Sequence, residues 1–290
     1  MIPKIKIENL CFSYNSHLPQ PQSVLKNINL TIHEREFIGL VGPTGSGKTT
    51  LLQHFTGLLK PTSGRILIDG QDLWQKNVKL SEIRKKIGLV FQFPETQLFE
   101  ERVYEDVAFG PRNLGLPEWE VEARVSSALN LVGMDFQQYK DRNPHQLSEG
   151  EMRRVALAGV LAMQPQVLAL DEPTAALDPQ GIKCIEDILR RFHLSNKTVI
   201  LISHNMDVVA RLTQRIVVLK DGEICFDGPK TELFDKNELL KEWGLEVPRI
   251  VLYVKKLWRL GYLSRTDLFS VQQLQRELNK CFKSEQISFL

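Results

Sequence analysis

A glycine-rich octet constrains the fold of this chain more than any other part of the sequence. Residues 42–49 read GPTGSGKT and fit the pattern G-x-x-x-x-G-K-[ST]. The octet follows the apolar run Phe37 to Val41 and precedes a helix-compatible stretch, Thr50 to Leu59. This is the strand, loop and helix order of a phosphate-binding loop, in which glycines let backbone N–H groups turn toward phosphates at a helix N-terminus. The octet therefore predicts an α/β domain that binds a nucleotide.

Two residues of the octet have specific expected roles. Lys48 is expected to reach the β- and γ-phosphates, and the Thr49 hydroxyl is expected to ligate Mg²⁺. A glycine-rich turn that fits by chance is the alternative, and such a match arises in roughly one chain in a hundred of this length. The candidate nucleotide-binding residues here are Gly42, Pro43, Thr44, Gly45, Ser46, Gly47, Lys48, Thr49 and Thr50.

A pair of carboxylates follows the apolar run Val167 to Leu170. Asp171, at the end of this predicted strand, can hold Mg²⁺, usually through water. Glu172 points to the other side of the chain and can polarise a water for attack on the γ-phosphate. Such a pair is often only the start of a solvated loop. Together with the upstream phosphate-binding loop, however, it predicts nucleotide hydrolysis.

The apolar pattern predicts a parallel β-sheet core with several attached parts. Four short, nearly continuous apolar runs are typical of strands covered on both faces: Phe37 to Val41, Ile87 to Phe91, Val167 to Leu170 and Thr198 to Ile202. Before them, residues 5–14 and 23–32 predict two strands of a partly exposed sheet. Residues 100–165 contain no comparable run and predict a helical insertion. Asp221-Gly222 predicts a hairpin turn.

Two amphipathic helices are predicted beyond residue 246. Val247, Ile250, Val251, Val254, Leu257 and Trp258 follow helical spacing. Ser270 and Gln273 are spaced as a capping box for a second helix. Residues 246–290 have a net charge of +4, whereas residues 1–245 have a net charge of −2. This segment can cap its own core or contact another subunit, and the sequence leaves both open.

Composition excludes several other classes. A net charge of +2 argues against a strongly basic nucleic-acid binder. The longest apolar run, Val155 to Met163, is much shorter than the 20 or so residues of a membrane span. The four cysteines show no metal-ligand spacing, and the first residues lack an apolar signal core. We therefore expect a reduced cytosolic compartment.

Residues 147–151 carry a resemblance to a known family. Leu147, Ser148, Glu149, Gly150 and Glu151 resemble the signature motif of ATP-binding-cassette (ABC) ATPases, which is usually Leu-Ser-Gly-Gly-Gln. Other motifs of the family occur in the expected order along the chain. Before the signature, Tyr14 resembles the adenine-stacking aromatic residue and Gln92 resembles the Q-loop glutamine. After it, His204 resembles the switch histidine, and the D-loop is resembled by Ala175, Ala176, Leu177 and Asp178. The resemblance covers nearly the whole chain, and seven ordered motifs are very specific.

This resemblance implies an architecture. We expect a P-loop NTPase (RecA-like) core with an N-terminal antiparallel β subdomain and a helical subdomain at about 100–165, all within an ABC ATPase domain of residues 1–245. Residues 246–290 would form a C-terminal helical extension for dimerisation or docking. In the family, two chains pack head to tail, and each ATP lies between one chain's phosphate-binding loop and the other chain's signature.

The resemblance also implies site residues for ATP and Mg²⁺. The implied catalytic residues are Glu172, His204, Gln92 and Lys48, and the implied metal ligands are Thr49, Gln92 and Asp171. Plainer alternatives are a core-covering strand aromatic for Tyr14, a strand-end cap for His204 and an ordinary polar strand end for Gln92.

The signature departs from the family at two positions. Glu149 replaces a glycine and Glu151 replaces the glutamine, so negative charge is added where a γ-phosphate would bind. This is unfavourable unless the carboxylates point away or pair with Arg153 or Arg154. We therefore hypothesise that the ATP site completed by this signature is the weaker or slower of the two.

Finer similarities point to the ATPases of energy-coupling-factor (ECF) importers. Residues 91–99 (FQFPETQLF) and 106–111 (DVAFGP) are similar to these proteins, and Phe93, Met206 and residues 245–248 (LEVP) indicate the second of their two paired ATPases. Phe93 and Phe99 would then line a groove for a helix of a membrane subunit, or alternatively anchor the loop as buried rings.

The function implied is ATP hydrolysis that drives uptake of a vitamin or transition metal. The implied partners are a sister ABC ATPase, a transmembrane coupling subunit and a substrate-binding membrane subunit, with the chain bound peripherally at the cytoplasmic face of the membrane. The alternative is an ABC-type ATPase that acts on DNA or ribosomes. The short helical insertion and the single cassette argue against it, so no nucleic-acid partner is expected.

Overall fold

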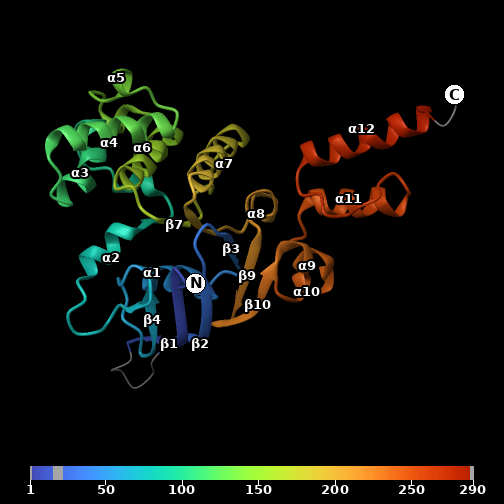
Figure 1. Ribbon diagram of the computed structural model, residues 1–290, viewed down its shortest axis with the longest axis horizontal. Helices are drawn as coiled ribbons and strands as arrows, with labels where there is room; N and C mark the ends of the chain where they lie inside the picture. The colour runs from blue at the N-terminus through green and yellow to red at the C-terminus, as the bar shows by residue number, and fades with distance from the viewer. Residues whose placement is uncertain (1, 16–21, 288–290) are drawn as a thin grey trace.

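A parallel sheet forms the centre of the molecule (Figure 1). The computed structural model describes residues 2–15 and 22–287, so residues 1, 16–21 and 288–290 of the predicted domains lie outside the described residues. Five strands of this sheet run parallel and β10 is antiparallel to them. Their order across the sheet is β10 (Glu223–Pro229), β9 (Arg215–Lys220), β3 (Phe37–Val41), β8 (Thr198–Ile202), β7 (Val167–Asp171) and β6 (Ile87–Val90).

The order of these strands brings the candidate residues to one edge. Leu40 of β3 and Asp171 of β7 both pair with Ile202 of β8. Since parallel strands end at the same edge of a sheet, the loop after β3, the carboxylates after β7 and the histidine after β8 lie together there. The α/β class and the four predicted apolar strands are confirmed.

A second, antiparallel sheet lies against the first. Its order is β2 (Gln22–Ile32), β1 (Ile5–Tyr14), β4 (Ser63–Ile68) and β5 (Gln71–Asp72). Leu51, Leu52 and Phe55 of helix α1 (Lys48–Phe55) are buried in one core cluster with residues of both sheets. Strands β4 and β5 were not predicted, although Asp69-Gly70 between them, with both φ angles positive, is a turn signal comparable to Asp221-Gly222.

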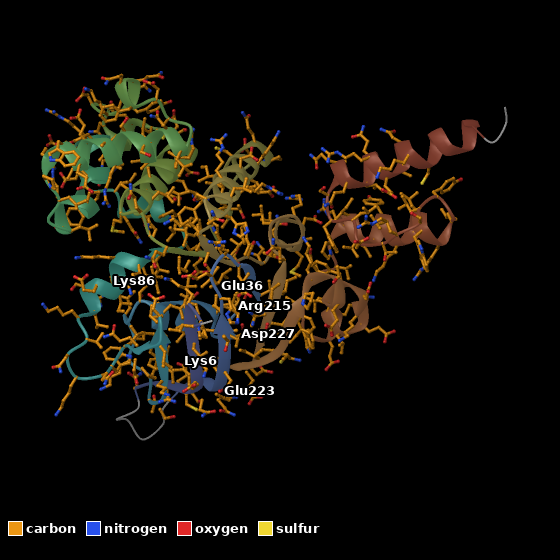
Figure 2. The ribbon with its side chains drawn as sticks, viewed as in Figure 1. Lys6, Glu36, Lys86, Arg215, Glu223 and Asp227 are labelled. Atoms are coloured by element: carbon orange, nitrogen blue, oxygen red, sulfur yellow. The ribbon has the colours of Figure 1, made fainter. Side chains whose placement is uncertain are left out.

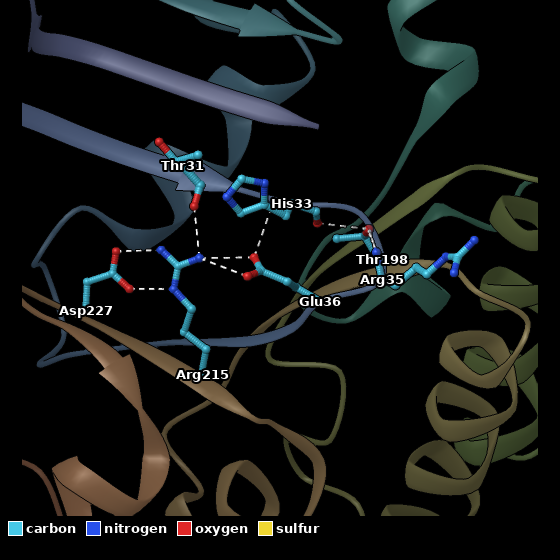
Figure 3. A network of polar contacts seen from close by, with 7 residues as sticks. All are labelled: Thr31, His33, Arg35, Glu36, Thr198, Arg215 and Asp227. Carbon is cyan, nitrogen blue, oxygen red and sulfur yellow. Dashed lines mark hydrogen bonds and ion pairs between the residues drawn. The ribbon is translucent and has the colours of Figure 1, made fainter. Parts of the chain in front are cut away.

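One arginine joins the two sheets (Figures 2 and 3). Arg215 of β9 donates to Asp227 of β10 through Nε and Nη2, at 2.6 Å each. Its Nη1 donates to the Thr31 carbonyl of β2 at 2.9 Å and to Glu36 Oε2 at 3.0 Å. Because these partners lie on β2, on β10 and just before β3, the guanidinium holds the antiparallel sheet in place against the core sheet.

Residues between β6 and β7 form a helical layer, as predicted. In the described chain no strand lies between these two. The helices enclose their own apolar cluster, which includes Val107, Val125 and Val155 and continues to the core sheet at Leu168. The elements are the 3₁₀ turns η1 (Pro94–Gln97) and η2 (Pro144–Gln146) and helices α3 (Val103–Asn113), α4 (Glu118–Leu131), α5 (Phe136–Tyr139) and α6 (Glu149–Ala162). Helix α2 (Leu80–Lys86) precedes β6.

The C-terminal helices pack on the molecule's own core. Ile250, Val251 and Val254 of α11 (Arg249–Arg259) are buried in a cluster with Leu233 and Phe234. Trp258, predicted on the same face, is instead 50% exposed. The other helices here are α7 (Pro179–Leu194), α8 (Met206–Leu212), α9 (Lys230–Asp235), α10 (Asn237–Glu242) and α12 (Val271–Ile287).

The start of α12 differs in one detail from the predicted capping box. Ser270 Oγ accepts the Gln273 N–H at 3.2 Å, as expected. The Gln273 side chain, however, accepts the N–H of Phe269 at 2.8 Å. Of the helices in residues 2–15 and 22–287, none combines the length and apolar character that a membrane crossing needs.

Candidate nucleotide site

The glycine-rich loop lies between β3 and α1 in a conformation that depends on glycine. Gly42 has φ +152°, and a Cβ there would lie 1.9 Å from the Leu219 carbonyl oxygen. Gly47 has φ +102°, and its Cβ would lie 2.9 Å from the Leu25 side chain. Gly45 has φ +81°, but a Cβ there would meet nothing within 4 Å, so its backbone conformation alone favours glycine.

Lys48 is surrounded by acceptors that carry no charge. Its Nζ donates to the carbonyls of Gly42 at 2.9 Å and Pro43 at 2.8 Å, and to Ser46 Oγ at 3.4 Å. Burial lowers the pKa of Lys48, while the charges of Glu172 and Asp171 oppose the shift. Within the described chain Lys48 forms no ion pair with a carboxylate. Its charge is therefore available to an anion that enters the loop.

Thr49 and Asp171 are brought together as the sequence predicts. Thr49 Oγ1 donates to Asp171 Oδ2 at 2.5 Å, and Asp171 is only 5% exposed at the end of β7. A hydroxyl and a carboxylate are oxygen donors of the kind that Mg²⁺ prefers, and Mg²⁺ takes few protein ligands. The donor set therefore fits this ion.

Glu172 and His204 form the next contact along the same edge. His204 Nδ1 lies 2.9 Å from Glu172 Oε2, which makes an ion pair when the imidazole is protonated. Glu172 has φ +49°, and its N–H donates to the Ile202 carbonyl of β8 at 3.0 Å. Burial raises the pKa of Glu172, against the effect of His204. Apart from this contact with His204, the buried Oε2 has no hydrogen-bond partner among the residues described, so it has a lone pair for a water.

Tyr14 and Gln92 occupy the periphery of this cluster. The Tyr14 hydroxyl lies 3.2 Å from Thr50 Oγ1, and its ring packs edge-on against Phe12 with centroids 4.8 Å apart. Tyr14 is 37% exposed, so it covers the core only in part. Gln92 is exposed just beyond β6, and in this structure its side chain makes no polar contact with Thr49 or Asp171.

The signature residues and the D-loop line a different hollow. This hollow of about 600 Å³ includes Ser148, Glu149, Gly150 and Glu151 together with Ala176, Leu177 and Asp178. A second hollow, of about 480 Å³, includes the loop residues 42–44, His204 and the segment 244–249. The two hollows share no residue, so the signature does not complete the loop of its own chain. Leu147, the first residue of the signature, is buried instead of lining the hollow, and the Ala175 carbonyl accepts a hydrogen bond from Arg153 of α6.

Arg153 is a buried connection that no motif of the sequence indicates. It is 3% exposed, and its Nε and Nη2 donate to Glu95 Oε2 at 3.0 Å and Oε1 at 2.6 Å. Its Nη1 donates to the Ala175 carbonyl at 2.6 Å, and the Ala175 N–H donates to the Glu172 carbonyl at 3.1 Å. Arg153 therefore links η1, α6 and the turn that holds Glu172. No local signal predicts this link, because Glu95 lies 58 residues away.

The loop after Gln92 presents aromatic rings at the surface. Phe93 is 40% exposed and Phe99 is 59% exposed, which excludes the alternative that both are buried anchors. Phe99 packs edge-on against Phe109, itself 48% exposed, with centroids 5.1 Å apart. The guanidinium of Arg153 lies 5.8 Å from the Phe93 ring centroid.

The fold and the site together define a nucleotide-binding ATPase of the phosphate-binding-loop class. A family model described as ABC transporter matches residues 25–175. The energy-coupling factor transporter ATP-binding protein EcfA2 of Clostridium tetani is 47% identical over 282 residues, covering 97% of this chain and 98% of that protein.

Solved structures agree with this match. The structure of cbiO1 from Clostridium perfringens, described as part of the ABC transporter complex cbiONQ, has a TM-score of 0.73 and 39% identity, covering 86% of this chain and 98% of its own. A dimeric structure of the ATP-binding cassette MJ0796, bound to ADP and Pi, has a TM-score of 0.69 and 32% identity. The match covers 78% of this chain and 98% of the MJ0796 chain. The chain belongs to the ABC transporter family, within the group of energy-coupling factor transporter ATP-binding proteins. It is an ATP-binding ATPase, and the alternative of a DNA or ribosome ATPase is not supported.

Proposed function

We propose that this chain is the second of two ATPase subunits of an energy-coupling-factor importer, and that it pairs head to tail with a sister ATPase. The cluster formed by Lys48 and the two contacting pairs Thr49–Asp171 and Glu172–His204 supports hydrolysis at its own loop. The names of the relatives, which are energy-coupling factor transporter proteins, support the transport role. The substrate taken up is a vitamin or a transition metal ion, carried by partner membrane subunits.

The position of each residue in the site is consistent with one role in ATP binding or hydrolysis. The glycine-rich loop and Lys48 bind the phosphates, and the partly exposed Tyr14 stacks on the adenine. Glu172 accepts a proton from the attacking water, and its raised pKa makes it a stronger base than an exposed carboxylate. His204, 2.9 Å away, holds the carboxylate and the γ-phosphate region in place.

Thr49, Asp171 and Gln92 would hold a magnesium ion here. When bound, the ion neutralises charge that develops on the phosphates. Gln92 is exposed and lies at the end of β6, beside β7. Its side chain would have to turn toward Asp171 before it could ligate the ion. The orientation of Gln92 would therefore differ between the ion-free and the ion-bound site.

The signature hollow would complete the ATP site of the sister subunit. Ser148, at the N-terminus of α6, and the D-loop residues 176–178 line a common open hollow. A helix N-terminus attracts the negative charge of phosphate. The dimeric structures of a similar cassette support pairing of this kind.

Two surfaces would receive the other partners. The exposed rings of Phe93 and Phe99 would contact a helix of the transmembrane coupling subunit, which places the chain peripherally at the cytoplasmic face of the membrane. The tail surface, defined here as the exposed apolar side chains of α11 and the following turn, would contact the sister ATPase. The tail surface comprises Leu252, Tyr253, Trp258, Leu260 and Tyr262.

The experiment that tests this function is reconstitution. The chain is co-expressed with its sister ATPase and membrane subunits, and Mg²⁺-dependent ATP hydrolysis and substrate uptake are measured in proteoliposomes. We expect both activities, and we expect Lys48→Ala in this chain to reduce uptake strongly. A cysteine at Gln97 should form a cross-link to the coupling subunit, whereas one at the exposed Trp119 should not. Co-purification without any membrane subunit would contradict the transport role.

A further inference from the structure

The first residues of α6 hold their own serine in a closed set of hydrogen bonds. Ser148 Oγ donates to Glu151 Oε2 at 2.8 Å, and the Ser148 N–H donates to the same oxygen at 3.0 Å. In return, the Glu151 N–H donates to Ser148 Oγ at 3.4 Å, which completes a capping box. Both donors of Ser148 therefore end on one carboxylate of its own chain.

A tyrosine from the neighbouring helix holds the other oxygen of that carboxylate. The Tyr139 hydroxyl, at the end of α5, donates to Glu151 Oε1 at 2.8 Å. The hydrogen bonds from Ser148, followed by the one from Tyr139, lower the pKa of Glu151, so the carboxylate is ionised at neutral pH. The charge and the orientation of Glu151 are thus both stabilised.

This carboxylate competes with a phosphate for the serine. A hydroxyl has one proton to donate, and while Ser148 donates it to Glu151 it cannot donate it to a phosphate oxygen. A glutamine at this position would also accept the bond, but a hydrogen bond to a charged acceptor is about twice as strong as one to a neutral acceptor. Glutamine would also add no negative charge beside the incoming phosphate.

The nearby arginines do not offset this charge through an ion pair. Arg153 is committed to Glu95 and Ala175, and Arg154 Nη1 donates to the carbonyls of Val132 and Gly133 at 3.4 and 3.3 Å. Neither arginine forms an ion pair with Glu149 or Glu151 in the part of the chain that the structure describes. Steric crowding at Gly150 does not prevent a phosphate from approaching the signature, since a Cβ on Gly150 would meet nothing within 4 Å.

We propose that Glu151 and Tyr139 keep this signature in a self-capped state, in which Ser148 must leave Glu151 before it can bind the γ-phosphate of the partner's ATP. The ATP site completed by this signature is therefore the slower of the two sites in the pair, and Tyr139 is a positioning residue that sets how slow it is. The inference rests on the proposed function, because head-to-tail pairing and the role of Ser148 come from there.

The test measures the two sites separately. In the pair with the sister ATPase, Glu172→Gln in this chain silences its own loop, so the remaining hydrolysis reports on the site completed by this signature. On this background we expect Glu151→Gln to raise the remaining rate about three- to tenfold. Glutamine keeps the capping box and removes only the charge. Tyr139→Phe, which removes one bond that holds the carboxylate, should give a smaller rise.

Two further variants make the result specific. Ser148→Ala, added to Glu151→Gln, should cancel the gain, because the gain depends on the Ser148 hydroxyl, which the neutral glutamine holds less tightly than the carboxylate does. Glu122→Gln on α4, which removes an exposed charge from the same helical layer, should leave the remaining rate unchanged.

Three outcomes would overturn the proposal. One is a Glu151→Gln rate equal to or below that of Glu122→Gln, and another is a gain that survives Ser148→Ala. The third outcome applies if thermal melting shows that Glu151→Gln is misfolded. In that case, a Tyr139→Phe variant with an unchanged remaining rate of ATP hydrolysis overturns the proposal by itself. A complete lack of hydrolysis in the unaltered pair would instead contradict the proposed function, so the two failures are distinguishable.

Discussion

Glu172 has an unusual backbone conformation for its residue type. Its φ of +49° lies in the left-handed region, which costs free energy for a residue other than glycine. Two hydrogen bonds offset this cost: its N–H donates to Ile202 and its carbonyl accepts from Ala175. In this conformation Glu172 contacts His204 while Asp171 contacts Thr49, so the carboxylate proposed to bind Mg²⁺ and the carboxylate proposed as the base have different partners.

Replacing this carboxylate is the sharpest test of its role. We expect Glu172→Gln to retain ATP binding and to slow hydrolysis at its own loop by about 10²–10⁴-fold, because the amide cannot accept the proton. Single-turnover hydrolysis and nucleotide binding, measured in the pair, separate the two effects. Full hydrolysis at this site in Glu172→Gln would exclude Glu172 as the base.

The raised pKa of Glu172 also predicts how stability depends on pH. The folded state binds the proton more tightly than the unfolded state, so this group's favourable contribution is complete below about 4.5, the ordinary pKa, and is lost as pH rises through the higher folded value. Glu172→Gln removes that loss. The melting temperature of the variant should therefore exceed that of the natural chain at pH 8, and the difference should shrink toward pH 5. A difference independent of pH would contradict the assigned shift.

At the scale of elements, Arg153 makes η1, α6 and the turn after β7 depend on one another. Burial opposes ionisation of Glu95, but the hydrogen bonds from Arg153 lower the pKa of this carboxyl and keep it charged. The turn η1 lies on the loop proposed to contact the membrane subunit. If η1 moved, Arg153 would move with it, because Arg153 is hydrogen-bonded to Glu95 of η1. The Ala175 carbonyl would then transmit the displacement to Glu172.

We call the contacts of Arg153 with Glu95 and with the Ala175 carbonyl the Arg153 junction. Breaking this junction should lower the free energy of unfolding more than breaking an ordinary ion pair does. Arg153→Met leaves the mostly buried Glu95 side chain, 11% exposed, without its partner, and we expect the free energy of unfolding to fall by about 3–5 kcal/mol. Arg153→Lys should restore only part of it, because lysine cannot make the same bidentate contact.

The matched control for this junction is Arg124→Met, which breaks the more exposed Arg124–Glu120 pair within α4, whose side chains are 19% and 30% exposed. Its expected cost is about 0.5 kcal/mol. Urea unfolding of the three variants measures both costs. Equal costs for the Arg153 and Arg124 variants would show that the junction contributes no more than a surface pair.

Over the whole molecule, α11 packs on the chain's own core, which is one of the two alternatives for the C-terminal segment, while contact with another subunit stays a proposal. One face, with Ile250 and Val254, covers the molecule's own core, and the tail surface on the other face remains exposed. In Figure 1 α11 and α12 lie at one end of the long axis, away from the helical layer. A second subunit can therefore contact the tail surface without approaching the loop after Gln92.

Pairing should depend on the tail surface. We expect Tyr253→Ser combined with Trp258→Ser to weaken pairing with the sister ATPase at least tenfold while leaving the fold intact, because both side chains are exposed by half or more. Analytical ultracentrifugation of the mixed subunits measures the dissociation constant. Trp119→Ser, which removes an even more exposed tryptophan from α4, should leave pairing unchanged. An unaltered dissociation constant in the double variant would assign pairing to other surfaces.

Local patterns were sufficient wherever a residue's role depends on its immediate neighbours. The octet from Gly42 to Thr49 and the strand before Asp171 were predicted because backbone conformation and burial follow from adjacent residues. Strands β4 and β5 were missed because the apolar part of β4 is only residues 66–68 and β5 spans only two residues. Trp258 was placed on the wrong face because helical spacing by itself does not say how wide the buried stripe is.

The sequence by itself determined the α/β class, the phosphate-binding loop and the unusual charge at the signature. The tertiary structure decided which partner each charged group has. It paired Arg153 with Glu95 rather than with the signature, placed Tyr139 on Glu151, and set His204 against Glu172. The physical reason is that hydrogen bonds and ion pairs act over a few ångströms, whereas their partners are brought within that distance only by the packing of elements far apart in the chain.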